Sequence, residues 1–210
     1  MKNYYAQYKE DEAVSKFIND SYVGNILDIG ANDGKTLSNS LHFIENGWGA
    51  TLIEASPIAF EKITSLHKDN DKVQSMNICL ANVNKKFKFY HNVTHLKKND
   101  TDLLSTISEV SYADSVGSGN PFTSFEIDCF RFDNIKTDLK YKTYDVISID
   151  IEGYDYEVLS QMNLTELGCK ILIIEYNRNN DVKNKIINHC ASFGLRKIIL
   201  DNTTNIIIAL

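Results

Sequence analysis

The stretch ILDIGANDG, residues 26–34, constrains the fold of this chain more than any other part of its sequence. Its apolar beginning predicts a buried strand, and Gly30 and Gly34 bracket the turn that follows. Apolar residues then recur at helical spacing, which predicts a helix over 35–46. This order of strand, glycine turn and helix places backbone N–H groups and a helix N-terminus around a ligand at the carboxyl end of the strand.

The turn also carries an acid, which separates two classes of cofactor. A dinucleotide-binding turn has the pattern G-x-G-x-x-G. Here the pattern is D-x-G-x-x-x-G, with Asp28 at the strand end and Asn32 where a middle glycine would stand. A carboxylate repels a diphosphate but attracts the ammonium group of an amino acid. The turn therefore resembles the first motif of class I methyltransferases that depend on S-adenosylmethionine (SAM).

A second acid lies at the end of the next predicted strand. The sequence WGATLIEA, residues 48–55, reads as that strand, and Glu54 stands near its carboxyl end. In βαβ nucleotide folds an acid at this place binds both ribose hydroxyls, because one carboxylate can accept two hydrogen bonds. Ser56 and Pro57 suit the N-cap and first position of a helix over 57–67. Two acids at successive strand ends indicate a ligand site rather than two solvated side chains.

The rest of the chain alternates between strands and helices, apart from one interruption. Strands are predicted over 72–81, 144–150 and 171–176, helices over 7–20, 154–162 and 181–193, and a closing hairpin around 201–205. In the interruption, 85–91 and 124–132 alternate with period two and predict two added strands. The stretch between them, 92–123, has no clear period and contains the loop signal SVGSGNP at 115–121. Long loops in compact domains are usually functional or disordered, so we interpret this one as a lid or substrate-recognition loop.

These elements predict one α/β domain over residues 1–210. We expect a Rossmann-like seven-stranded mixed sheet with six parallel strands, one antiparallel strand and helices on both faces. A small β/loop insertion would occupy 85–132, and a helical segment 1–24 would precede the first strand.

Composition limits the class of protein and its partners. The chain is 43% hydrophobic and 24% charged, as is ordinary for a globular domain, and its formal net charge is −6. No basic run is present, so nucleic acid is not an expected partner. The four cysteines are far apart and read as reduced core residues of a cytoplasmic protein. The N-terminus lacks the apolar region of a signal peptide, and no run is long enough to cross a membrane.

The sequence SIDIEGYDYE, residues 148–157, makes the resemblance to one family specific. Asp150 to Gly153 match the D-[VI]-E-G segment of FkbM-like methyltransferases, and LDIGANDG, LIEASP, NICLAN and LIIEYN resemble further motifs of that family over nearly the whole chain. The resemblance implies SAM as cofactor and methyl transfer to an oxygen, with a hydroxyl of a sugar, glycan or small natural product as acceptor. The acceptor itself and the oligomeric state stay open.

The resemblance also implies which residues would contact SAM. The amino-acid end would lie near the turn, the ribose at Glu54, and the adenine beside residues 79–81, with Asp150 between cofactor and acceptor. The implied cofactor-binding set is Asp28, Gly30, Ala31, Asn32, Gly34, Glu54, Ala55, Cys79, Leu80, Ala81 and Asp150.

Methyl transfer requires alignment of the acceptor oxygen and removal of its proton. Asp150 is the first candidate for the proton acceptor and Glu152 the second, although Glu152 could simply shape its turn. His91 and His95 border the predicted lid and are weaker candidates. Acids at strand ends, Glu175 included, would also suit Mg²⁺, but the spacing does not demand a metal and none is expected to be obligatory.

Two other functions remain as alternatives. A non-catalytic SAM-binding module would be expected to lack Asp150 or Glu54, and both are present. An oxidoreductase of the nicotinamide (NAD) type would be expected to have glycine at position 32, where this chain has asparagine.

Overall fold

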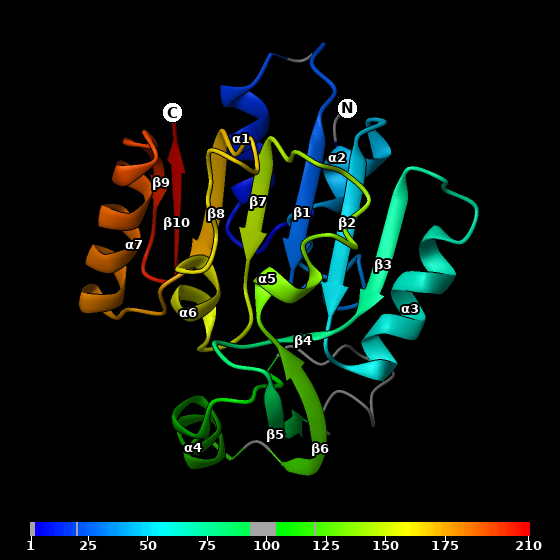
Figure 1. Cartoon of the computed structure of the whole chain (residues 1–210), viewed down its shortest axis with the longest axis vertical. Helices are drawn as coiled ribbons and strands as arrows, with labels where there is room; N and C mark the ends of the chain where they lie inside the picture. Colours follow the sequence, from blue (N-terminus) through cyan, green and yellow to red (C-terminus); the bar gives the residue numbers. More distant parts are fainter. Residues whose placement is uncertain (1–2, 20, 93–103, 120) are drawn as a thin grey trace.

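The computed structural model describes residues 3–19, 21–92, 104–119 and 121–210, and a seven-stranded sheet forms its centre (Figure 1). The order of the strands across the sheet is β3-β2-β1-β7-β8-β10-β9. In that order they are β3 (Val73–Asn77), β2 (Gly49–Glu54), β1 (Asn25–Ile29), β7 (Val146–Ile149), β8 (Ile171–Glu175), β10 (Asn205–Ala209) and β9 (Lys197–Asp201). The strands from β3 to β8 pair in parallel, and β10 pairs antiparallel with both β8 and β9. This confirms the predicted Rossmann-like fold.

The central strands are buried on both faces, which explains their continuous apolar sequence. Ile26 of β1 stands beside Val146 of β7, and Leu27 beside Ile147. Successive side chains point to opposite faces, so the first pair belongs to one hydrophobic cluster and the second pair to another.

Helices cover both faces of the sheet, as predicted. The cluster on one face contains side chains from α1 (Glu10–Phe17), α2 (Leu41–Glu45) and α3 (Pro57–His67). The cluster on the other face contains side chains from α5 (Phe132–Ile135), α6 (Asp155–Leu159) and α7 (Asn180–Ser192). None of the helices in the described residues has the length and apolarity needed to span a bilayer.

A second, three-stranded sheet lies below the carboxyl ends of the central strands (Figure 1). It contains β4 (Cys79–Leu80), β6 (Phe122–Phe130) and β5 (Lys85–Asn92), and β5 and β6 are the two added strands that the sequence predicts. Helix α4 (Glu109–Gly117) packs on this sheet, where the ring of Tyr112 stacks on that of Tyr90 at a centroid distance of 3.9 Å.

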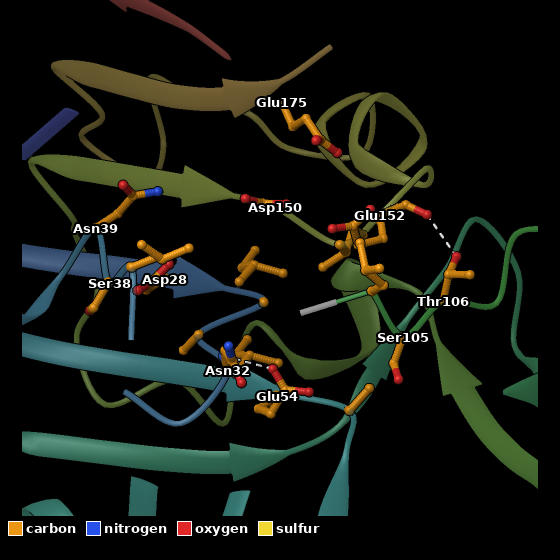
Figure 2. A pocket seen from close by; sticks show the side chains of 18 of the residues that line it. Asp28, Asn32, Ser38, Asn39, Glu54, Ser105, Thr106, Asp150, Glu152 and Glu175 are labelled. Carbon is orange, nitrogen blue, oxygen red and sulfur yellow. Dashed lines mark hydrogen bonds between the residues drawn. The ribbon is translucent and has the colours of Figure 1, made fainter. Parts of the chain in front are cut away.

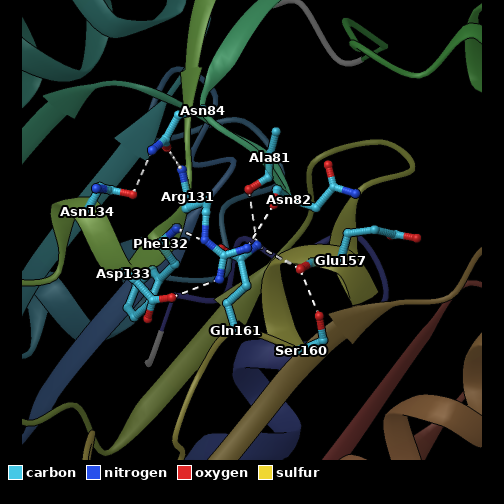
Figure 3. Close-up of polar contacts among 10 residues, drawn as sticks. All are labelled: Ala81, Asn82, Asn84, Arg131, Phe132, Asp133, Asn134, Glu157, Ser160 and Gln161. Carbon is cyan, nitrogen blue, oxygen red and sulfur yellow. Dashed lines mark hydrogen bonds and ion pairs between the residues drawn. The ribbon is translucent and has the colours of Figure 1, made fainter.

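Polar contacts join the second sheet to α6 (Figure 3). Gln161, just after α6, donates from its side chain to the backbone oxygen of Ala81 at 3.0 Å, and its side-chain oxygen accepts the N–H of Phe132 at 3.0 Å. The guanidinium of Arg131 donates to the backbone oxygen of Asn82 at 2.8 Å. These bonds fix the ends of β4 and β6 beside the central sheet.

The helix predicted over 35–46 is wrong for its first half, because only Leu41–Glu45 are helical. The Asp33 carboxylate accepts the N–H groups of Lys35 and Thr36, at 2.9 and 2.6 Å. Such local bonds compete with a helix for the same donors. No helix N-terminus therefore follows the glycine turn directly.

Two other element predictions also need correction. The strand predicted over 72–81 is two strands, β3 and β4, which belong to different sheets. The stretch 92–123, predicted to lack regular structure, contains α4, which includes Ser115 to Gly117 of the supposed loop signal. Residues 93–103, with His95, lie outside the described part of the chain.

Candidate functional site

A cavity of about 550 Å³ opens at the carboxyl ends of β1, β2, β7 and β8 (Figure 2). This is the edge at which open α/β sheets bind ligands, and the volume lies in the range of small-molecule sites. Its lining includes the predicted residues Asp28, Gly30, Ala31, Asn32, Glu54, Ala55, Cys79, Leu80, Asp150 and Glu152.

The turn after β1 directs its N–H groups into the protein. The N–H groups of Gly30 and Ala31 both donate to the backbone oxygen of Ile53, at 2.9 and 3.1 Å. A Cβ on Gly30, whose φ is +87°, would overlap the backbone oxygen of Asp150. The glycine is thus required by the close approach of two strand ends. A turn whose donors are already engaged offers no cradle for a diphosphate.

Glu54 fixes the far side of this turn. Its carboxylate accepts the N–H of Asn32 at 2.8 Å and the N–H of Ser56 at 2.7 Å. An ionised carboxylate has about four lone-pair sites, so one such group can accept several hydrogen bonds. The side-chain amide of Asn32 is buried, and neither its oxygen nor its nitrogen has a partner among the described residues. Figure 2 shows both side chains at the cavity wall.

Asp28 is the most enclosed of the acids in the turn. Its side chain is only 3% exposed and accepts a hydrogen bond of 2.6 Å from the hydroxyl of Ser40. Burial raises the pKa of Asp28, and the hydroxyls of Ser40 and Ser148 partly offset that rise. A cationic group entering the cavity beside this carboxylate would favour its ionised form.

Asp150 follows the central strand β7 and faces the cavity. Its backbone N–H donates to the oxygen of Ile29 at 2.9 Å, which holds its position against β1. Its carboxylate accepts no hydrogen bond from the described residues, and burial, followed by the charge of Asp155 and then that of Asp28, raises its pKa to about 7. Glu152, two residues later, also lines the cavity, and its backbone oxygen accepts the hydroxyl of Thr106 at 2.6 Å.

Three predicted site residues lie outside the cavity lining. Gly34, with φ +74°, faces α3, where an added Cβ would touch Ile63. Ala81 is fully buried where β4 meets β6. His91 is 5% exposed within the second sheet, and its ring nitrogen lies 3.4 Å from the hydroxyl of Ser56.

The comparison with family models matches residues 28–195, about four fifths of the chain, to the methyltransferase FkbM domain. The chain belongs to the FkbM methyltransferase family. This confirms the family predicted from the sequence, with SAM as its cofactor, and replaces the nicotinamide alternative.

Solved structures support the fold at low sequence identity. The FkbM methyltransferase from Methylobacillus flagellatus KT is 13% identical, with a TM-score of 0.56 over 89% of this chain and 43% of that one. The methyltransferase domain of METTL16 is 11% identical, with a TM-score of 0.52 over 95% of this chain and 63% of that one. This chain therefore spans less than two thirds of the length of either structure. A search of curated proteins returns no match.

The sequence did not single out several other residues that line the cavity of this FkbM domain, although 104–107 belong to the predicted recognition loop. They come from four segments: Tyr8 and Glu10 by α1, Ser38 and Asn39 before α2, residues 104–107 before α4, and Asn177, Arg178, Thr204 and Asn205 near the ends of β8 and β10. Most of them are polar residues in loops or at the ends of helices and strands, with no recognisable spacing. Only their position after a strand could have suggested a role.

Proposed function

We propose that this FkbM domain is a SAM-dependent O-methyltransferase whose acceptor is a hydroxyl of a sugar, a glycan or a small natural product. The observation that carries the proposal is the Asp150 carboxylate, which faces the cavity from the central strand end and accepts no hydrogen bond from the described residues. SAM supplies an activated methyl group and its leaving group. The protein then has to align the acceptor oxygen and take up its proton.

SAM fits the part of the cavity nearest the turn after β1. In this proposal Glu54 accepts the ribose hydroxyls. The amide of Asn32, which has no partner among the described residues, donates to and accepts from the amino-acid end. The buried carboxylate of Asp28 lies near the ammonium group. The adenine lies against Cys79 and Leu80, the two residues of β4, which are apolar and line the same cavity.

The acceptor occupies the remaining part of the cavity, between Asp150 and the segment before α4. The hydroxyl of Thr106 donates to the backbone oxygen of Glu152 at 2.6 Å, which fixes this segment against the Asp150 turn. Within the 92–123 segment, we assign the predicted role in acceptor recognition to residues 104–107, which line the cavity. Polar groups here suit an acceptor with several hydroxyls.

Asp150 is the proposed proton acceptor, and Glu152 is second. A carboxylate with free lone pairs, whose pKa burial has raised, can take the hydroxyl proton as the oxygen attacks the methyl carbon. His91 is a weaker candidate than the sequence suggested, because its side chain does not line the cavity.

The test uses Asp150→Asn, with the exposed Asp138→Asn as a matched control. Turnover would be followed as release of S-adenosylhomocysteine (SAH) from SAM over a panel of mono- and oligosaccharides and hydroxylated natural products. We expect a loss of about 10²–10⁴ for Asp150→Asn, the usual effect of removing a general base, with little change for Asp138→Asn. Undiminished turnover in a folded Asp150→Asn protein would refute the base assignment. SAH binding without transfer to any acceptor would favour the non-catalytic alternative.

A further inference from the structure

Three carboxylates converge where β7 and β8 end. Asp150 follows β7, Glu175 ends β8, and Asp155 begins α6. One oxygen from each lies within 4.8 Å of the other two. In Figure 2 the Glu175 side chain extends from the end of β8 toward the turn that carries Asp150 and Glu152.

The protein does little to balance these charges. No described lysine, arginine or histidine forms an ion pair with any of the three carboxylates. Asp155 accepts two backbone N–H groups, from Ile151 at 2.9 Å and Gly153 at 3.0 Å. The carboxylates of Asp150 and Glu175 accept no hydrogen bond from the described residues, although Glu175 is only 7% exposed. Buried charges are normally paired or bound to metals.

An independent observation points to the same place. Asn205 of β10 stands directly opposite Glu175 in the antiparallel pairing, so the two side chains share one face of the sheet. Asn205 is 5% exposed. The nitrogen of its side-chain amide donates to the Glu10 carboxylate at 2.7 Å, so the other end of the amide is its oxygen. That oxygen is buried and has no partner among the described residues. Because an amide oxygen is an acceptor, the partner that this oxygen lacks is a hydrogen-bond donor or a cation.

We propose that Asp150, Asp155 and Glu175 bind a divalent cation of the calcium or magnesium class, with the amide oxygen of Asn205 beside it. Both ions prefer oxygen ligands. Oxygens on opposite sides of Ca²⁺ lie about 4.6–5.2 Å apart and those around Mg²⁺ about 4.0–4.2 Å apart, twice the respective metal–oxygen distances. The three oxygens, all within 4.8 Å of one another, are close enough to share one ion of either kind.

The site would adjoin the acceptor part of the cavity, because Asp150 and Glu175 both line it. A carboxylate has two oxygens, so Asp150 can bind the ion with one and the acceptor with the other. A cation also makes a nearby hydroxyl more acidic. The binding site itself, however, can be tested without any acceptor.

The experiment titrates the EDTA-treated protein with CaCl₂, MgCl₂ and MnCl₂ by calorimetry, and with Mn²⁺ by electron paramagnetic resonance. About 0.15 M KCl would screen surface carboxylates. We expect one ion per chain and at least tenfold weaker binding for Glu175→Gln. Asp150→Asn provides a second variant if Glu175→Gln does not fold. Glu54→Gln, an acid on the opposite side of the same cavity, should retain the ion.

The outcomes distinguish this proposal from the proposed function. Absence of saturable binding up to about 10 mM, above the range of weak calcium modules, would overturn the cation site. Wild-type ion affinity in both Glu175→Gln and Asp150→Asn would place the ion elsewhere and overturn it as well, as would its loss in Glu54→Gln. SAH titrated in the presence of EDTA tests the cofactor site separately, whatever the result with metal.

Discussion

Substitution of Glu54 by glutamine tests the cofactor site most directly, because the structure gives this carboxylate two roles. It holds the N–H groups of Asn32 and Ser56, at 2.8 and 2.7 Å, and in the proposal it also binds the ribose. Glutamine has the same size, but its NH₂ group would face one of these N–H donors without accepting from it. The variant therefore loses at least one charge-assisted bond within the protein and one to the ligand.

The magnitudes follow from those two losses. A hydrogen bond to a charged group contributes about 1.5–3 kcal/mol, and 1 kcal/mol shifts the melting temperature of a domain of this size by about 2–4 °C. The melting temperature of unliganded Glu54→Gln should fall by roughly 3–12 °C. The lost ribose contact should weaken SAH binding by about tenfold to a hundredfold.

Calorimetry with SAH, performed well below the melting temperature, measures the second effect, and Asp33→Asn is its control. Asp33 accepts the N–H groups of Lys35 and Thr36 in the same turn but does not line the cavity. Its variant should melt earlier and yet bind SAH within about twofold of wild type, as for substitutions away from a site. Wild-type affinity in Glu54→Gln would refute the ribose role. An equal loss in Asp33→Asn would mean that turn order, rather than a direct contact, explains the effect.

Three other perturbations test the fold and the acceptor region. Removal of residues 115–120, which include the end of α4, should leave SAH affinity unchanged in calorimetry but impair methyl transfer; parallel losses would contradict a role in acceptor recognition. Gly30→Ala should destabilise the protein in urea unfolding far more than Gly119→Ala, whose φ is also positive but whose added Cβ meets nothing within 4 Å. Burial alone would raise the pKa of Asp145, but hydrogen bonds from Lys170 and others outweigh it, so the pKa is lowered in the fold. Its stabilising effect should be full above the unfolded pKa of about 3.9 and vanish as the pH falls through the lower folded value; melting curves of Asp145→Asn and wild type should converge there.

The sequence predicted the fold and the strand-end acids because both depend on repeating patterns. Buried parallel strands need continuous apolar runs, and an acid at the end of such a run must lie at the ligand edge of the sheet. The helix over 35–46 failed for a local reason. Leu37 has φ +55°, and Ser38 accepts the N–H groups of Ser40 and Leu41, so side chains take the donors that a helix would use.

The sequence did not predict helix α4, because this helix has no buried face. None of its residues is buried, and its attachment depends on contacts such as the stacked pair of Tyr112 and Tyr90. Hydrophobic periodicity records only the burial of one helix face, so a helix held by one aromatic ring leaves no such signal. Thr106 could not be identified from the sequence either, because its hydrogen bond to Glu152 depends on tertiary placement.

Backbone conformation around the cavity shows a further feature that the sequence does not reveal. Of the six described non-glycine residues with positive φ, five line the cavity: Asn32, Leu37, Glu152, Asn177 and Arg178. Leucine, glutamate and arginine are not residues that predict a left-handed conformation, which costs roughly 1–2 kcal/mol for a residue with a Cβ.

Specific hydrogen bonds hold several of these residues in place. The N–H groups of Asn177 and Arg178 donate to Thr204 and Thr203, at 3.1 and 2.9 Å, and the backbone oxygen of Glu152 accepts from Thr106. Strained backbone persists where surrounding contacts determine it, and it concentrates at functional sites. The bonds come from the turn between β9 and β10 and from the segment before α4, both distant in sequence from the strained residues. The shape of the cavity therefore depends on the assembled fold, whereas the positions of its acids depend on where the strands end. Sequence patterns reveal strand ends but not tertiary contacts. They therefore identified the acids but not the other residues that line the cavity.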